Sequence, residues 1–173
     1  MLTFLRSPRI RNDAGFSLIE LMVVCGLFII LAAIAAPAST DWLANYRLKV
    51  GASDVYAALQ LARSTALKEN NDVVVWFDVN NDTYRLYEDE DGDRNQDAGD
   101  KTIKDGTIED GVDMYNTSFS SWSNQTYFNS RGIAEGGWGY VFLQSDTDKY
   151  KRITLWTTGN LKIETSSDGS SWN

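Results

Sequence analysis

Oxygen-bearing side chains alternate along the stretch from Glu88 to Asp100, which reads EDEDGDRNQDAGD. Calcium takes about six to eight oxygen ligands, and carboxylates at alternate positions of a loop can supply several of them. The spacing departs from that of an EF-hand, because glycine stands at the fourth position of the loop instead of the sixth and the last ligand is Asp. The candidate calcium ligands are Asp89, Asp91, Asp93, Asn95 and Asp97.

Two other interpretations of this acidic stretch are open. A charge-dense segment between two strands is usually a solvated turn, and we favour such a turn, without a cofactor, over a calcium site. A carboxylate-pair hydrolase is a third possibility, but so polar a loop lacks the apolar pocket that raises the pKa of one carboxylate. The chain contains no histidine, which excludes Ser-His-Asp and Cys-His catalysis and histidine-ligated zinc. We therefore expect that this protein is not an enzyme.

A short basic cluster near the C-terminal end consists of Lys149, Lys151 and Arg152. Three positive charges could contact a few phosphates of DNA. Lysines also stand at exposed strand edges, where they discourage edge-to-edge pairing. The net charge of −8 disfavours general binding to nucleic acid or to anionic lipid headgroups. The cluster is thus a DNA-binding candidate only as an alternative.

An uncharged apolar run extends from Leu21 to Ala38, and Arg6, Arg9 and Arg11 precede it. A basic segment before an apolar run is typical of a helix delivered to a membrane with its basic end in the cytoplasm. The position of Glu20 at the edge of this run requires an explanation, because burying a carboxylate at the centre of a bilayer costs about 2–3 kcal/mol or more.

A cut between Gly15 and Phe16 would supply that explanation. It would create a positively charged α-amine four residues before Glu20, and this amine could pair with the carboxylate. The sequence from Gly15 to Glu20, GFSLIE, resembles the cleavage site of type IV pilin-like proteins, including type II secretion pseudopilins. The resemblance implies that a prepilin peptidase cuts after Gly15 and methylates Phe16. It also implies that Glu20 pairs with the terminal amine of a neighbouring pilin or pseudopilin subunit. An ordinary signal anchor would explain the apolar run but not Glu20 or the Gly-Phe pair.

The resemblance and the hydrophobic pattern together predict an α+β chain with a long N-terminal transmembrane helix and a C-terminal β-rich globular head, as in pilins. We expect a leader peptide at 1–15, a transmembrane and assembly helix at 16–40, an amphipathic continuation of the helix at 41–69 and a periplasmic head at 70–173. Without the leader, which holds three of the 16 basic and one of the 24 acidic residues, the net charge becomes −10. Alternating apolar residues predict strands at 73–77, 83–87, 126–129, 139–143, 152–157 and 161–164.

The C-terminal half carries a second, looser resemblance. The turn Phe128 to Gly132 and a hairpin at Thr158-Gly159-Asn160 are similar to those of the pseudopilin H and FimT minor-pilin family. Cys25 is the single cysteine, so the C-terminal disulfide of many pilins is absent. The serine-rich tail, 166–173, is compatible with disorder.

The predicted function is that of a non-enzymatic minor pilin or pseudopilin in a type II secretion pseudopilus or a type IV pilus. It would reside in the inner membrane as a single-pass protein, with its head in the periplasm, and would enter a filament through its N-terminal helix. The alternative is a DNA-binding minor pilin of a DNA-uptake pilus, since some FimT-like proteins bind DNA through basic residues near the C-terminus. The sequence does not distinguish a pilus from a secretion system.

Overall fold

The computed structural model describes residues 15–173, except for the side chains of residues 34–39. Its contacts divide the chain into two units, Met1–Ser39 and Thr40–Asn173. The helix α1, Leu18–Glu69, contributes to both units. The predicted leader, apart from Gly15, lies outside the described residues.

The helical part of the second unit buries a stripe of apolar side chains with the spacing of an amphipathic helix. The stripe comprises Leu48, Ala52, Val55, Leu59, Ala62 and Ala66, none more than 1% exposed. Alanine at several of these positions lets the backbone of α1 approach the sheets closely. The helical periodicity predicted for this stretch is confirmed, and α1 ends at Glu69 as expected.

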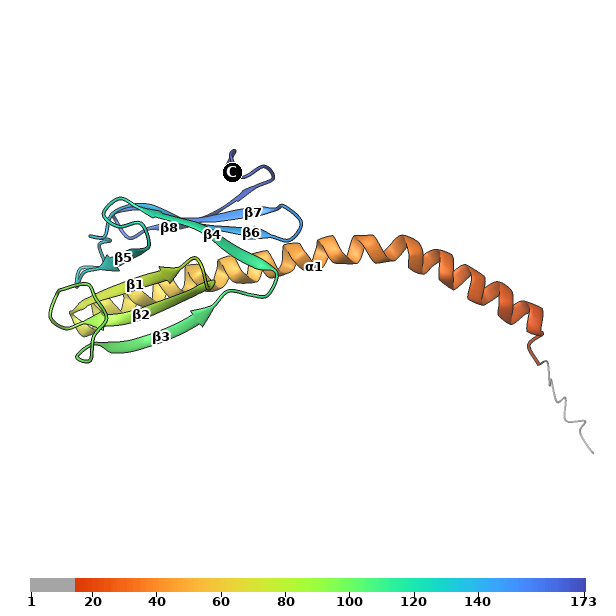
Figure 1. The fold of residues 1–173 in the computed structure, drawn as a ribbon, viewed down its shortest axis with the longest axis horizontal. Coiled ribbons are helices and arrows are strands. Elements are labelled where there is room, and N and C mark those ends of the chain that lie inside the picture. Colours follow the sequence, from red (N-terminus) through yellow and green to blue (C-terminus); the bar gives the residue numbers. More distant parts are fainter. Residues whose placement is uncertain (1–14) are drawn as a thin grey trace, which may run out of the picture. The chain divides into compact units, whose positions relative to one another are not determined.

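Eight antiparallel strands form two sheets that share one core with α1 (Figure 1). The first sheet has the strand order β3-β2-β1-β5 and the second β4-β6-β7-β8. The strands are β1 (Asp72–Asp78), β2 (Thr83–Asp89), β3 (Lys101–Thr107), β4 (Val112–Phe119), β5 (Gln125–Phe128), β6 (Gly139–Ser145), β7 (Tyr150–Leu155) and β8 (Leu161–Ser166). The predicted α+β head is thus confirmed.

Two strands, β3 and β4, were not predicted from the sequence. Neither shows a regular alternation of apolar and polar residues, and each has a physical reason for this. β3 is an edge strand, KTIKDGT, that buries almost nothing, and its Gly106 leaves room for the ring of Tyr84. A Cβ on Gly106 would lie 2.1 Å from that ring. β4 alternates correctly only up to Met114, where a bulge shifts its register against β6. An extra residue moves the next side chains to the other face and hides a period of two.

The predicted hairpin between β7 and β8 is present. Gly159 adopts a φ of 79°, and the N–H of Trp156 donates to the carbonyl of Asn160 over 3.0 Å. The serine-rich tail is not disordered, contrary to the sequence interpretation. Asn173 and Thr165 exchange two backbone hydrogen bonds, which hold the tail against β8.

Arg63 of α1 ties this hairpin to the turn after β5. Its guanidinium donates to the carbonyl oxygens of Gly132 and Gly159, each over 3.0 Å, and to that of Thr158 over 3.4 Å. Both glycines have positive φ, and a Cβ on Gly159 would lie 2.4 Å from the Gly132 oxygen. The side chain of Arg63 therefore holds two turns together. Each turn needs a glycine, because its backbone has a positive φ and the two turns approach each other closely.

Candidate functional site

The residues of the predicted processing motif lie just before and within the first turn of α1. Gly15, Phe16 and Ser17 precede the helix, which begins at Leu18, and Glu20 lies in its first turn. An acidic side chain there is favoured by the positive end of the helix dipole. Gly15, Phe16 and Glu20 are all exposed, and Phe16 is 83% exposed. Within the described part of the chain, the motif is therefore accessible to a peptidase.

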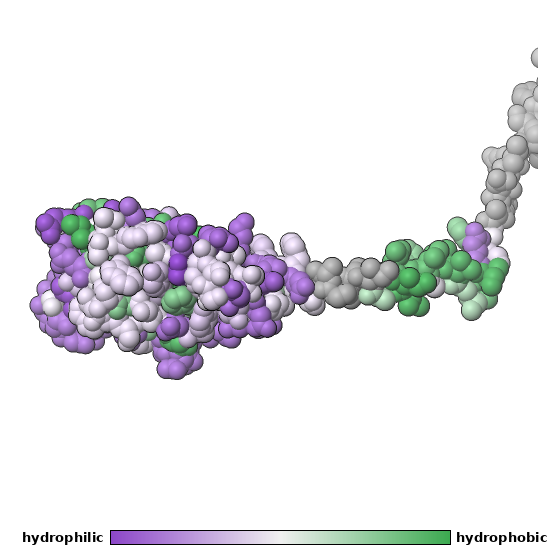
Figure 2. All heavy atoms as spheres, turned by 90° about the horizontal axis from the view of Figure 1, so that it is seen from above, coloured by the Kyte–Doolittle hydropathy of each residue, from purple (hydrophilic) through white to green (hydrophobic). Residues whose placement is uncertain are grey.

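The same unit exposes an apolar helix surface. Between residues 18 and 31, the large apolar side chains are 40–77% exposed, and Figure 2 shows them as a continuous green band. Isolated exposed apolar residues are normal in proteins, but a contiguous apolar surface marks an interaction site. Among the described residues, no helix combines the length and the apolar character needed to cross a membrane. The predicted span, 16–40, includes the positions 34–39, whose side chains are not described.

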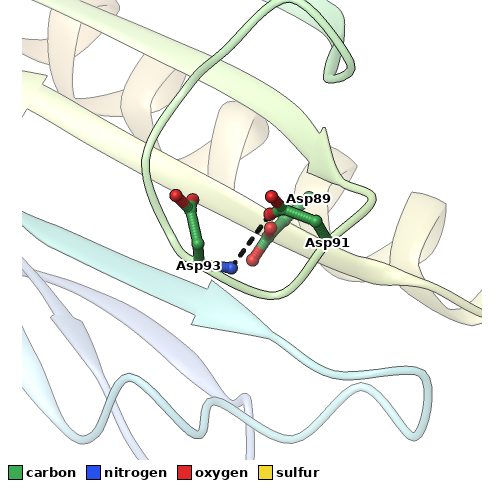
Figure 3. A group of neighbouring side chains, drawn as sticks. All are labelled: Asp89, Asp91 and Asp93. Carbon is green, nitrogen blue, oxygen red and sulfur yellow. Dashed lines mark hydrogen bonds between the residues drawn. The ribbon is translucent and has the colours of Figure 1, made fainter.

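The acidic stretch forms the connection between β2 and β3, and we call residues 89–100 the acidic loop. One carboxylate oxygen from each of Asp89, Asp91 and Asp93 lies within 4.8 Å of the other two (Figure 3). Asp97 does not join this group, whereas the amide nitrogen of Asn95 lies 3.4 Å from an oxygen of the Asp93 carboxylate. The structure thus brings together three of the four aspartates among the candidate calcium ligands.

Arg94 occupies the buried side of this group. Its guanidinium forms ion pairs with Asp89, whose side chain is 0% exposed, and with Asp72 at 2.8 Å. It also stacks 4.1 Å from the ring centre of Tyr127 in β5. Burial lowers the pKa of Arg94, but its hydrogen bonds to Asp89 and Tyr127 and the charges of Asp89 and Asp72 together outweigh that effect and raise it. Arg94 therefore supplies the positive charge that a calcium ion would bring to Asp89.

The carboxylates of Asp91 and Asp93 accept hydrogen bonds from the backbone of the acidic loop itself. Asp91 accepts the N–H of Asp93 over 3.1 Å, and Asp93 accepts the N–H of Asn95 over 2.6 Å (Figure 3 draws the first). The Tyr87 hydroxyl donates to the carbonyl of Arg94 over 2.9 Å, which fixes the loop to the outer face of the first sheet. Burial and the charges of Asp89, Asp100 and Asp93 raise the pKa of Tyr87 to about 12. The loop is therefore anchored, and the interpretation as a solvated turn is wrong for Asp89.

We expect no calcium-specific stabilisation of the head. A site occupied at a hundredfold excess over its dissociation constant would add about 2.7 kcal/mol, or several degrees of melting temperature. Thr40–Asn173 holds every buried apolar residue of the described chain, so a fragment of this range is suited to melting. Melts in chelator, millimolar calcium and millimolar magnesium should give equal, small shifts for both ions. A rise with calcium alone that Asp91→Ala abolishes and Asp110→Ala preserves would contradict this expectation.

The predicted basic cluster is divided by the structure. Arg152 forms an ion pair with Glu164 at 2.7 Å and lies between the rings of Tyr140 and Trp172, 4.6 and 4.7 Å from their centres. Burial would raise the pKa of Glu164, but hydrogen bonds from Arg152, Thr154 and Lys162 lower it to about 2. The guanidinium of Arg152 is therefore paired with a carboxylate and packed against two aromatic rings.

Lys149 and Lys151 instead share a cavity of about 480 Å³ with Lys49 of α1. The sequence interpretation missed Lys49, which is a hundred positions away from Lys149 in the chain. It also missed Arg63, whose partners are backbone carbonyls, and Arg94, one of whose two carboxylate partners, Asp72, lies 22 residues earlier in the chain. The isolated Arg94 among so many acids was the one available signal of an internal ion pair.

Comparison with known proteins agrees with this architecture. Residues 51–159 match the model of the family "Type II transport protein GspH", and residues 10–36 match the prokaryotic N-terminal methylation motif. The chain spans about two fifths of the length of the curated relatives it matches. Over 64 residues it is 39% identical to fimbrial proteins of Pseudomonas aeruginosa, covering 37% of this chain and 41% of theirs.

Two solved structures share the fold. The minor pseudopilin EpsH from the type 2 secretion system of Vibrio cholerae aligns with a TM-score of 0.54 at 19% identity, over 68% of this chain and 95% of that one. The type IV minor pilin FimU of Pseudomonas aeruginosa aligns with a TM-score of 0.56 at 14% identity, over 75% and 94%. Since the first family match covers more than half of the chain, the protein belongs to the GspH family of type IV pilin-like proteins and carries their N-terminal methylation motif.

Proposed function

We propose that this protein is a non-enzymatic filament subunit that a prepilin peptidase cuts between Gly15 and Phe16 and methylates at Phe16. The observation that carries the proposal is the exposed Gly-Phe junction placed directly before an apolar helix with Glu20 in its first turn. The family match and the methylation motif support it.

Before assembly, the helix at 16–40 anchors the chain in the inner membrane, and the head lies in the periplasm. An apolar helix that leaves the bilayer cannot remain in water, because hydration of its exposed side chains is unfavourable. It therefore packs against the equivalent helices of other pilin or pseudopilin subunits, which replace lipid around it. The filament is a type II secretion pseudopilus or a type IV pilus. Of the three basic residues named for the DNA-uptake alternative, Arg152 is held by Glu164.

Substitutions at Gly15 should separate processing from insertion. We expect Gly15→Ala to be cut partly and Gly15→Glu to keep its leader completely, because a charged side chain would enter the peptidase beside the scissile bond. Both variants should still insert in the membrane, since the apolar run is unchanged. Electrophoretic mobility of the membrane-extracted protein, with Gly26→Ala as the matched control, measures the fraction cut. Normal cleavage of Gly15→Glu would refute the assigned cleavage position.

A further inference from the structure

The cavity between α1 and the C-terminal tail gathers three positive charges. We call it the lysine cavity; it holds about 480 Å³ and is lined by Lys49, Lys149 and Lys151 beside hydroxyl and amide side chains. The Nζ atom of Lys151 donates to the Thr165 hydroxyl over 3.0 Å. Over the described part of the chain, none of the three ammonium groups forms an ion pair. Burial lowers the pKa of Lys151, and the charge of Lys49 lowers it further, so an anion in the cavity would relieve a repulsion.

Two acids that come close to these lysines in the chain have other partners. Asp168 is the one acid of the serine-rich tail, and it accepts the N–H groups of Ser170 and Ser171, each over 2.9 Å. Asp148, in the turn between β6 and β7, accepts the side-chain amide of Gln144 over 2.9 Å. The lysine cavity therefore offers positive charge and hydrogen-bond donors to an anion from another molecule.

Two aromatic side chains lie beside the lysine cavity along α1. Trp42 and Tyr46 are 68% and 54% exposed, and their rings stack with centres 5.8 Å apart. With Lys49 they follow the spacing of one helix face, and they begin four positions after the apolar run 21–38. Tryptophan and tyrosine are enriched at membrane surfaces, where their rings lie at the level of the lipid headgroups. Lys49 follows Tyr46 by about 4.5 Å along the helix, within a headgroup layer of about 5–8 Å.

The negative net charge of the chain does not cancel this local positive charge, because the acidic loop lies far away. Arg94 binds that loop to Asp72, just beyond the end of α1. Lys49 lies twenty residues before Glu69, the last residue of α1, which is about 30 Å along the helix. Figure 1 likewise places the β2–β3 and β6–β7 connections at opposite ends of the sheets. The Debye length in physiological salt is about 8 Å, so salt screens the loop from an anion in the cavity.

We propose that the lysine cavity binds the phosphate group of an anionic phospholipid in the membrane that holds the N-terminal helix. The ammonium groups neutralise the phosphate, and the hydroxyl groups of the cavity donate to its oxygens. Because basic side chains at a membrane surface attract anionic lipids, the contact seats the head on the bilayer before assembly. It is lost when the chain leaves the bilayer for a filament. The inference rests on the proposed membrane anchor and adds a contact that the N-terminal helix does not make.

Lipid retention by the full chain tests this contact. The chain is reconstituted into vesicles of equal parts phosphatidylglycerol and phosphatidylcholine and extracted in mild detergent, and native mass spectrometry then counts its bound lipids. The wild type should retain more phosphatidylglycerol than phosphatidylcholine. Lys49→Gln, Lys149→Gln and Lys151→Gln combined should lower this ratio at least about tenfold, because each lysine at a membrane surface adds to the attraction. The arginines of the leader are the same in both chains and cannot cause the difference.

Lys68→Gln, Lys101→Gln and Lys162→Gln combined are the matched control. These three lysines are exposed, pair with carboxylates and lie outside the cavity. The control removes the same charge and should keep the wild-type lipid ratio. Arginine at all three cavity positions should keep it as well, since the positive charge remains. An equal fall of the ratio in the two glutamine triples would overturn the proposal, because net charge alone would then attract the lipid.

Other occupants of the lysine cavity give different results. Millimolar inorganic phosphate should leave the lipid ratio unchanged, since it lacks the acyl chains that pack beside the apolar helix. If phosphate lowers the ratio as far as the glutamine substitutions do, the cavity takes a free anion and the proposal fails. It also fails if those substitutions spare the ratio but abolish a DNA gel shift or entry into filaments. A wild-type chain that does not insert into the vesicles would instead contradict the proposed membrane anchor.

Discussion

Glu20→Val should insert in the membrane normally but fail to enter filaments. In the proposed assembly the carboxylate of Glu20 meets the terminal amine of a neighbouring Phe16 in an apolar helix bundle. Removing one partner leaves a buried charge uncompensated, at a cost of about 3–5 kcal/mol, which is more than a hundredfold in association. Valine itself adds apolar surface, so insertion into lipid does not suffer.

Shearing the filaments from cells and immunoblotting the sheared and membrane fractions measures this effect. Glu69→Val is the matched control, because Glu69 ends the same helix and forms an ion pair with Lys68 at the surface. Its incorporation should equal that of the wild type, since an exposed pair contributes little. Normal incorporation of Glu20→Val would show that this carboxylate has no assembly role here.

Arg63→Met should lower the stability of the head by about 3 kcal/mol, and its melting temperature by about 10 °C. Methionine keeps the aliphatic stem of Arg63 but leaves the carbonyls of Gly132 and Gly159 without their charged donor. Both carbonyls belong to glycine turns whose conformation the guanidinium holds. The loss should therefore spread to the hairpin of β7 and β8.

Thermal melts of the Thr40–Asn173 fragment measure this change. Lys68→Met makes the same change of charge five residues further along α1, where the lysine pairs with Glu69 at the surface. It should shift the melt by no more than about 0.5 kcal/mol. A melting temperature of Arg63→Met equal to that of the control would contradict the role assigned to the guanidinium.

The parts of the molecule that rest on local pattern were predictable from the sequence. The apolar stripe from Val55 to Ala66 repeats with the period of a helix, and Gly159 beside Asn160 specifies a tight hairpin. The Gly15-Phe16 junction with Glu20 is equally local, and it indicated the family that the comparison confirmed. Each of these features depends on residues that are close together in the sequence.

The features that the sequence did not reveal depend on distant partners or broken periodicity. Arg63 finds its acceptors 69 and 96 residues away, in backbone carbonyls that carry no sequence signal. The bulge after Met114 hid β4. Arg94 turned an acidic loop with calcium-like spacing into an anchored one, through a bond to Asp72, 22 residues earlier. Which acids of such a loop are neutralised follows only from the fold.

Mass spectrometry of the N-terminal peptide shows whether the protein is processed into a filament subunit. The protein should be extracted from membranes of cells with an active prepilin peptidase. The chain should begin at Phe16, and its α-amine should carry one methyl group, whereas a peptidase-deficient strain should give the uncut chain. An intact Met1 start, or an unmodified terminus elsewhere, in cells with active peptidase would contradict the proposed processing.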